Sequence, residues 1–104
     1  MSEKLEFSVV ENENSVMISL AGSLDATNAG ELLEELKKLI GKQIEKIEFS
    51  VSGLEYIASA GLRVIIFTKQ KIGKEADIYL ISPQYDVKEV VKMSGLDNFI
   101  IIEE

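Results

Sequence analysis

Cysteine, histidine and tryptophan are all missing from this chain of 104 residues, and proline occurs only once. Without cysteine the protein forms no disulfide and offers no thiolate to a metal. Without histidine it lacks the usual general base near neutral pH, the Ser-His nucleophile pair and the commonest transition-metal ligand. We therefore expect no catalytic residue, no metal site, no cofactor and no enzymatic activity.

Long apolar runs and a signal-peptide pattern are also missing. The longest runs, "VIIF" and "FIII", fall far short of the about 18 residues that would span a bilayer. The first residues, "MSEKLEFSVV", include acidic groups where a signal peptide needs a basic region. The net charge of −7 repels phosphate backbones and anionic lipids. We expect a soluble, cytoplasmic protein that binds neither nucleic acid nor membranes, with acidic groups that serve solubility or a basic protein partner.

The remaining composition, 46% hydrophobic and 28% charged, is that of an ordinary globular domain. No repeat, linker or low-complexity block interrupts the chain, so we expect one domain over residues 1–104. Alternating or continuous apolar segments predict strands. The predicted strands lie at 5–10, 15–21, 46–51 and 76–82 and in the final "NFIII".

Helical periodicity predicts three helices between these strands. The first begins near Thr27 and ends at Gly41, and the second covers 59–72. The third has Ser82 as N-cap and Pro83 as its first residue. The order β-β-α-β-α-β-α-β predicts an α/β fold with a mixed, mostly parallel sheet covered by crossover helices.

Ser59 is the one serine within "EYIASAGLRVII", at the point where a strand and loop give way to a helix. A serine there is suited to cap the helix, because its oxygen can accept bonds from the first free N–H groups. A nucleophile elbow needs G-x-S-x-G, whereas Ile57 occupies the upstream glycine position and no histidine exists to take the proton. Capping and modification by another protein are the two hypotheses that remain.

The second helix carries large apolar groups on two sides when residues are placed at 100° intervals. We predict that one set faces the sheet and that the other lies opposite it. The opposite set either packs against a neighbouring helix or forms a docking surface. The first set is Leu62, Ile65, Ile66 and Ile72, and the second is Ala60, Val64, Phe67 and Lys71.

The segment "GSLDATNAGE" also has two interpretations. Asp25 and Thr27 are good caps for the first helix, and Gly22 permits a tight turn. If the strands at 15–21 and 46–51 are parallel neighbours, this loop and the predicted 53–58 loop lie at the same sheet edge. Partners and ligands of open α/β sheets are bound at that edge. A nucleotide site has weak support, since no G-x-x-x-x-G-K-[ST] or G-x-G-x-x-G motif is present.

Three segments, taken in order, resemble the signatures of the STAS domain, specifically the bacterial anti-sigma factor antagonists. They are "AGSLDATNAGEL", "IEFSVSGLEYIASAGLRVII" and "ISPQYDVKEVVKMSGL", and the resemblance covers essentially the whole chain. It implies a protein that binds an anti-sigma factor, itself a serine kinase, and so releases a sigma factor. The implied switch is phosphorylation by that kinase and dephosphorylation by a serine phosphatase.

Matched residue by residue, the phosphorylated serine of the family falls on Ser59. Ala58 stands where an aspartate is usual and Ala60 where a second hydroxyl is usual, whereas Gly61 and Leu62 match. The resemblance implies a partner-binding surface formed by the 22–28 loop, the Ser59 turn and the second helix. The residues predicted for it are Ser23, Asp25, Thr27, Ala58, Ala60, Gly61, Arg63, Val64 and Phe67.

Two alternatives to this function remain open at the level of sequence. Within the same fold, the chain could serve as a STAS module of a stress-signalling scaffold or of a transport assembly. From a different class, it could be a nucleotide-binding or weakly hydrolytic domain.

Overall fold

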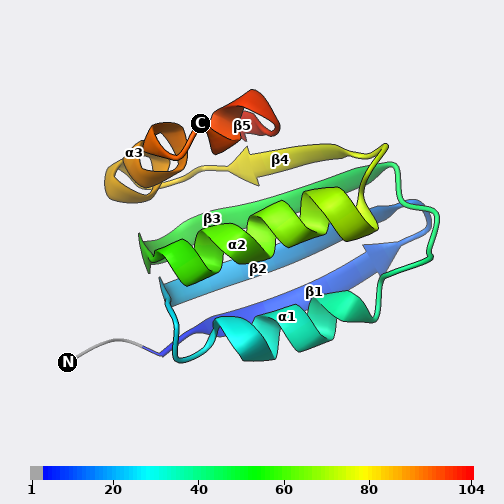
Figure 1. The fold of residues 1–104 in the computed structure, drawn as a ribbon, viewed down its shortest axis with the longest axis horizontal. Coiled ribbons are helices and arrows are strands. Elements are labelled where there is room, and N and C mark those ends of the chain that lie inside the picture. Colours follow the sequence, from blue (N-terminus) through cyan, green and yellow to red (C-terminus); the bar gives the residue numbers. More distant parts are fainter. Residues whose placement is uncertain (1–3) are drawn as a thin grey trace.

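The computed structural model describes residues 4–104, in which five strands form one sheet with the order β1-β2-β3-β4-β5 (Figure 1). β1 and β2 are antiparallel, and the other three neighbouring pairs are parallel. The strands are β1 (Glu6–Asn12), β2 (Ser15–Leu24), β3 (Lys46–Ile57), β4 (Asp77–Ile81) and β5 (Ile101–Glu103). The helices are α1 (Ala29–Lys37), α2 (Ser59–Phe67), the π turn η1 (Thr68–Ile72), α3 (Tyr85–Met93) and the 3₁₀ turn η2 (Leu96–Asn98). The predicted fold class and element order are confirmed.

One face of the sheet carries the core. Along β2, Val16, Ile18 and Leu20 are buried while the residues between them are partly or fully exposed. α1 and α2 lie side by side over this face, and α1, α2 and α3 all add buried apolar groups to the same core (Figure 1). Within residues 4–104, no helix is long and apolar enough to cross a bilayer.

The opposite face of the sheet is open within the described residues. Its middle row runs across all five strands through the paired positions Val10, Met17, Glu48, Tyr79 and Ile101. Three of these apolar side chains are exposed. The helices thus cover one face only, which gives the molecule two layers.

The buried stripe of α2 differs from the predicted one. Val64, predicted to face outward, is 3% exposed, and Ile66, predicted to face the sheet, is 38% exposed. A glycine and a threonine, which a count of apolar residues leaves out, complete the stripe. It consists of Gly61, Val64, Ile65, Thr68 and Ile72. The buried Thr68 hydroxyl donates to the carbonyl of Val64 at 2.8 Å, so its burial leaves the hydroxyl with a hydrogen-bond partner.

Gly61 fixes how closely α2 approaches the sheet. A Cβ atom at this position would lie 2.7 Å from Cγ of Leu24 and 2.7 Å from Cγ1 of Ile57, closer than carbon atoms pack. Both contacts are made by the last residues of their strands. The glycine therefore places the first turn of α2 directly on the ends of β2 and β3.

β3 is longer than predicted, because residues 53–57 continue the strand instead of forming a loop. The pairing with β2 shifts register twice, once between Ser19 and Ala21 and once between Gly22 and Ser23. A β-bulge of this kind absorbs an extra residue without ending the strand. Residues that predict a turn in the sequence, such as Gly53, lie here within a bulged strand.

Two other boundaries also differ from prediction. The N-cap of α3 is Gln84, not Ser82, and Ser82 adopts a positive φ of 55° while its N–H donates to the carbonyl of Glu103 at 2.7 Å. The last strand begins at Ile101, since Asn98 ends η2 and residues 99–100 form a turn. A long-range backbone bond overrides the local capping signal in the first case.

Gly22 holds the end of β2 against the start of the described chain. Its φ is +93°, and a Cβ atom would lie 2.0 Å from the carbonyl oxygen of Lys4. Neither the backbone conformation nor the space admits a side chain. By contrast, a Cβ at Gly30, within α1, would meet nothing within 4 Å.

We expect Gly22→Ala to lower the free energy of unfolding by at least about 2 kcal/mol, because the left-handed conformation alone costs roughly 1–2 kcal/mol and the clash adds to it. Gly30→Ala is the matched control and should raise stability by about 0.5–1 kcal/mol, since it replaces an exposed helical glycine. Urea denaturation measures both. Equal effects of the two substitutions on the free energy of unfolding would contradict the left-handed conformation and close contact assigned to Gly22.

Candidate partner-binding site

β2 and β3 end side by side, and this brings the two predicted motifs together. Leu24 pairs with Ile57, and the N–H of Ala58 donates to the carbonyl of Leu24 at 2.9 Å. The turn that follows β2 and the first turn of α2 therefore leave the sheet at the same edge. The condition for a shared edge, that strands two and three are parallel neighbours, is met.

The turn after β2 is held by side chain to backbone bonds. The Asp25 carboxylate accepts from the Thr27 N–H at 2.9 Å and from the Thr27 hydroxyl at 2.6 Å. Asn28 accepts from the Asp25 N–H and donates to the Ser23 carbonyl, each at 2.9 Å. These bonds fix the loop conformation and tie it to the end of β2 through the Ser23 carbonyl.

Asp25 and Thr27 are not the caps of α1. The N-cap residue is Asn28, whose side chain points back into the turn and makes no capping bond. The two bonds from Thr27 lower the pKa of the Asp25 carboxyl, with the hydroxyl bond contributing most, because they favour the ionised form. The turn thus displays a carboxylate that stays charged at neutral pH.

Ser59 is the first residue of α2, and its side chain is exposed. The N-cap position is Ala58, in an extended conformation, and its carbonyl accepts from the N–H groups of Gly61 at 2.9 Å and Leu62 at 3.1 Å. Within residues 4–104 no side chain caps this helix. The hypothesis that Ser59 caps α2 is therefore wrong, because the serine comes one residue too late.

The structure sorts the predicted partner-binding residues by accessibility. Ser23, Gly61 and Val64 are buried and offer no side chain to a partner, since each packs within the protein. Four others are half-buried, and two are exposed beside Ser59. The half-buried residues are Asp25, Ala58, Ala60 and Phe67, and the exposed ones are Thr27 and Arg63.

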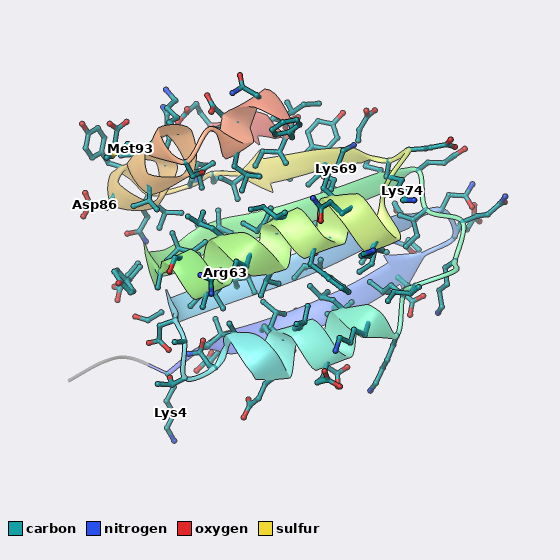
Figure 2. The ribbon with its side chains drawn as sticks, viewed as in Figure 1. Lys4, Arg63, Lys69, Lys74, Asp86 and Met93 are labelled. Carbon is teal, nitrogen blue, oxygen red and sulfur yellow. The ribbon has the colours of Figure 1, made fainter. Side chains whose placement is uncertain are left out.

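Figure 2 shows Arg63 on the part of α2 near the edge where β2 and β3 end. It is the fourth residue after Ser59 and therefore lies one helical turn away on the same side. The exposed site thus combines a carboxylate at Asp25, a hydroxyl at Ser59 and a guanidinium at Arg63.

Three residues near this edge were missed from sequence. Asn28 fixes the turn that carries Asp25, and Tyr56 is 53% exposed opposite Ser23 in the β2–β3 pairing. Ile66 is exposed on α2, two turns after Ser59. Only Asn28 had a local signal, as an asparagine three residues after the aspartate of a turn.

The site has no arrangement suited to metal chemistry. Among the residues that the structure describes, no group of three or more carboxylates could hold a metal ion. What the edge offers is an accessible hydroxyl at the start of a helix, next to a rigid turn.

We expect Ser59→Ala to leave the free energy of unfolding within about 0.5 kcal/mol of the wild type, since the hydroxyl is exposed and caps nothing. Ala58→Ser should raise it by about 1 kcal/mol, because serine at the true N-cap can accept a bond from the first turn. Thermal and urea unfolding of the two variants measure the difference. Loss of about 1 kcal/mol in Ser59→Ala would restore the capping hypothesis.

Thr27→Val should raise the pKa of Asp25 toward its ordinary value, because it removes the hydroxyl bond while keeping the backbone bond. A carboxyl whose pKa is lowered by folding stabilises the protein above its unfolded pKa, and that contribution is lost as the pH falls through the folded pKa. An NMR titration of the Asp25 carboxyl measures the shift. Ser59→Ala is the control, and a pKa unchanged in Thr27→Val would refute the assigned cause.

Comparison of the chain with known proteins identifies relatives in sequence and in fold. The family model of the STAS domain matches residues 6–104. The anti-sigma-F factor antagonist RsfB of Mycobacterium tuberculosis is 20% identical over 96 residues, which cover 92% of this chain and 79% of RsfB.

Solved structures of two further proteins show the same fold. An anti-sigma factor antagonist from Mycobacterium paratuberculosis superposes with a TM-score of 0.84 at 19% identity, over 96% of this chain and 86% of that one. The Bacillus protein SpoIIAA gives a TM-score of 0.82 at 19% identity in its unphosphorylated form, over 95% of this chain and 89% of that one. Its phosphorylated form gives 0.74 at 18% identity, over 95% and 92%. With the family model matching nearly its whole length, the chain belongs to the STAS domain family.

Proposed function

We propose that the protein is an anti-sigma factor antagonist that is switched at Ser59. The unphosphorylated form binds an anti-sigma factor with serine kinase activity and so releases a sigma factor. Phosphorylation of Ser59 ends this binding. The observation that carries the proposal is the exposed Ser59 hydroxyl, placed beside the rigid Asp25 turn at one edge of the sheet.

The surroundings of Ser59 suit phosphoryl transfer from a partner. Its neighbours Ala58 and Ala60 are small, so the hydroxyl has open space around it. In the transfer the serine oxygen forms a bond to the γ-phosphorus of ATP, ADP leaves, and the hydroxyl proton passes to a base of the kinase. This chain needs to supply only the hydroxyl, which agrees with its lack of histidine.

The fold should tolerate the phosphate. Phosphorylation adds about −1.5 to −2 charges, and α2 begins at this point with no acidic residue in its first turn. The N-terminus of a helix favours negative charge, because its free N–H groups point outward. The phosphate therefore changes the surface and leaves the core intact.

The interface should not tolerate it. Arg63 lies one turn after Ser59 on the same side of α2, so a phosphate can pair with its guanidinium and withdraw it from a partner. The phosphate also adds negative charge to an edge that already carries the ionised Asp25 carboxylate. A partner that fits the neutral hydroxyl would meet a bulky dianion and a neutralised arginine.

Two comparisons support this proposal. RsfB is named as an antagonist of anti-sigma-F factor, and SpoIIAA was solved both with and without phosphate. Ala58 departs from the aspartate that is usual in the family, so the kinase of this protein would recognise a site without that carboxylate. A serine phosphatase would restore the binding form, and the switch would operate in the cytoplasm, where sigma factors act.

The test is incubation with an anti-sigma kinase from the same organism and ATP, followed by intact mass measurement and a binding assay. We expect one added phosphoryl group on wild type and none on Ser59→Ala. Ser59→Glu should bind the kinase at least tenfold more weakly than wild type, with nearly unchanged melting temperature. Tight binding without any added phosphate would refute the switch at Ser59. No binding by wild type would favour another role of the STAS module.

A further inference from the structure

An apolar groove lies between α2 and the segment that leads from α3 to β5. Ile66, Lys69 and Gln70 line it from α2 and η1. The opposite wall is formed by Ser94, Gly95, Leu96 and Phe99. The groove has a volume of about 270 Å³, and Phe99 at its rim is 66% exposed. A partner that covers an exposed apolar side chain of this size removes its surface from water, which favours binding.

The charge on the α2 and η1 side of the groove is opposite to that of the protein as a whole. Residues 59–74 contain four of the 11 basic residues and none of the 18 acidic ones. Of these four, Arg63 lies on α2, Lys69 on η1 and Lys74 in the turn after η1, and Figure 2 shows them in that order along the segment. The Lys69 ammonium donates to the carbonyl of Ala76 at 3.1 Å and keeps donors for a further acceptor. The segment from α2 through η1 to Lys74 is therefore a positive strip on an acidic protein.

The groove is continuous with the site at Ser59. Ile66 follows Ser59 by seven residues, which is two turns of helix on the same side and about 10 Å along its axis. Arg63 lies between them and is exposed. A partner that covers the Ser59 turn and extends along α2 reaches the groove.

We infer that this groove, lined by Ile66, Lys69 and Phe99, is a second docking point for the anti-sigma factor. The occupant is an acidic segment of that partner, which inserts one large apolar side chain between Ile66 and Phe99 and places carboxylates beside Lys69 and Arg63. The inference rests on the proposed function for the identity of the partner. The apolar walls and the positive charge of Lys69 and Arg63 on one side of the groove determine the chemistry of the segment.

The first experiment measures binding of the unphosphorylated protein to its anti-sigma factor. Phe99→Ala should weaken binding about tenfold, because it removes an exposed wall of the groove. Met93→Ala is the matched control, since Met93 is 86% exposed on α3 but does not line the groove (Figure 2). Lys69→Gln should weaken binding several-fold and reduce its dependence on salt. Melting temperatures of all three variants show whether each still folds.

The second experiment tests the chemistry of the groove without the anti-sigma factor. The probe is a synthetic helical peptide with one phenylalanine flanked by glutamates, titrated into the isotopically labelled full chain. We expect NMR shifts at Ile66, Gln70, Leu96 and Phe99. Peptides with alanine in place of phenylalanine, or with lysines in place of the glutamates, should not produce them.

The outcomes separate this inference from the proposed function. Wild type that binds the anti-sigma factor, with Phe99→Ala and Lys69→Gln binding equally well, overturns the groove and leaves the switch standing. Wild type that binds no anti-sigma factor refutes the proposed partner, and the groove as its docking point falls with it. In that case peptide shifts at the groove would show that the site accepts this chemistry from another protein. Equal shifts with the lysine peptide would show that charge plays no part.

Discussion

The close contact of Gly61 with the ends of β2 and β3 is the constraint on which the rest of the site depends. The missing side chain lets α2 rest on Leu24 and Ile57, and the buried stripe of the helix follows from that point of contact. Once Gly61 faces inward, the residues two positions away on either side, Ser59 and Arg63, face outward at the edge. Ser59 is therefore exposed because Gly61 is buried.

The turn at Asp25 is the second fixed element, and it is rigid for a different reason. Its conformation is held by local hydrogen bonds among Asp25, Thr27 and Asn28 and by the bond from Asn28 to the Ser23 carbonyl. Packing positions Ser59, whereas polar bonds position Asp25. The two meet only because parallel pairing of β2 and β3 brings their ends together. A site divided in this way can change its turn without disturbing its helix.

Much of the fold could be predicted from sequence, because strand alternation and helix-ending glycines are local signals. The hairpin, the parallel neighbours and the sheet edge that carries Asp25 and Ser59 were all accessible in this way. The orientation of α2 was not, since a glycine and a threonine took positions in the buried stripe that a count of apolar residues assigns elsewhere. Val64 and Ile66 consequently exchanged places between prediction and structure. The long bulged end of β3 was equally inaccessible, because it depends on pairing with β2 and not on residues 53–57 alone.

The alanine at the N-cap of α2 has a consequence for how often this helix opens. Without a capping side chain, the first turn forgoes about 1 kcal/mol of stabilisation, which corresponds to roughly fivefold more frequent local opening at 25 °C. An opened first turn exposes Ser59 within an extended stretch of backbone. Ala58 thus makes Ser59 easier to draw into the active site of the proposed kinase, while the tightly packed Gly61 keeps the opening confined to the residues before it.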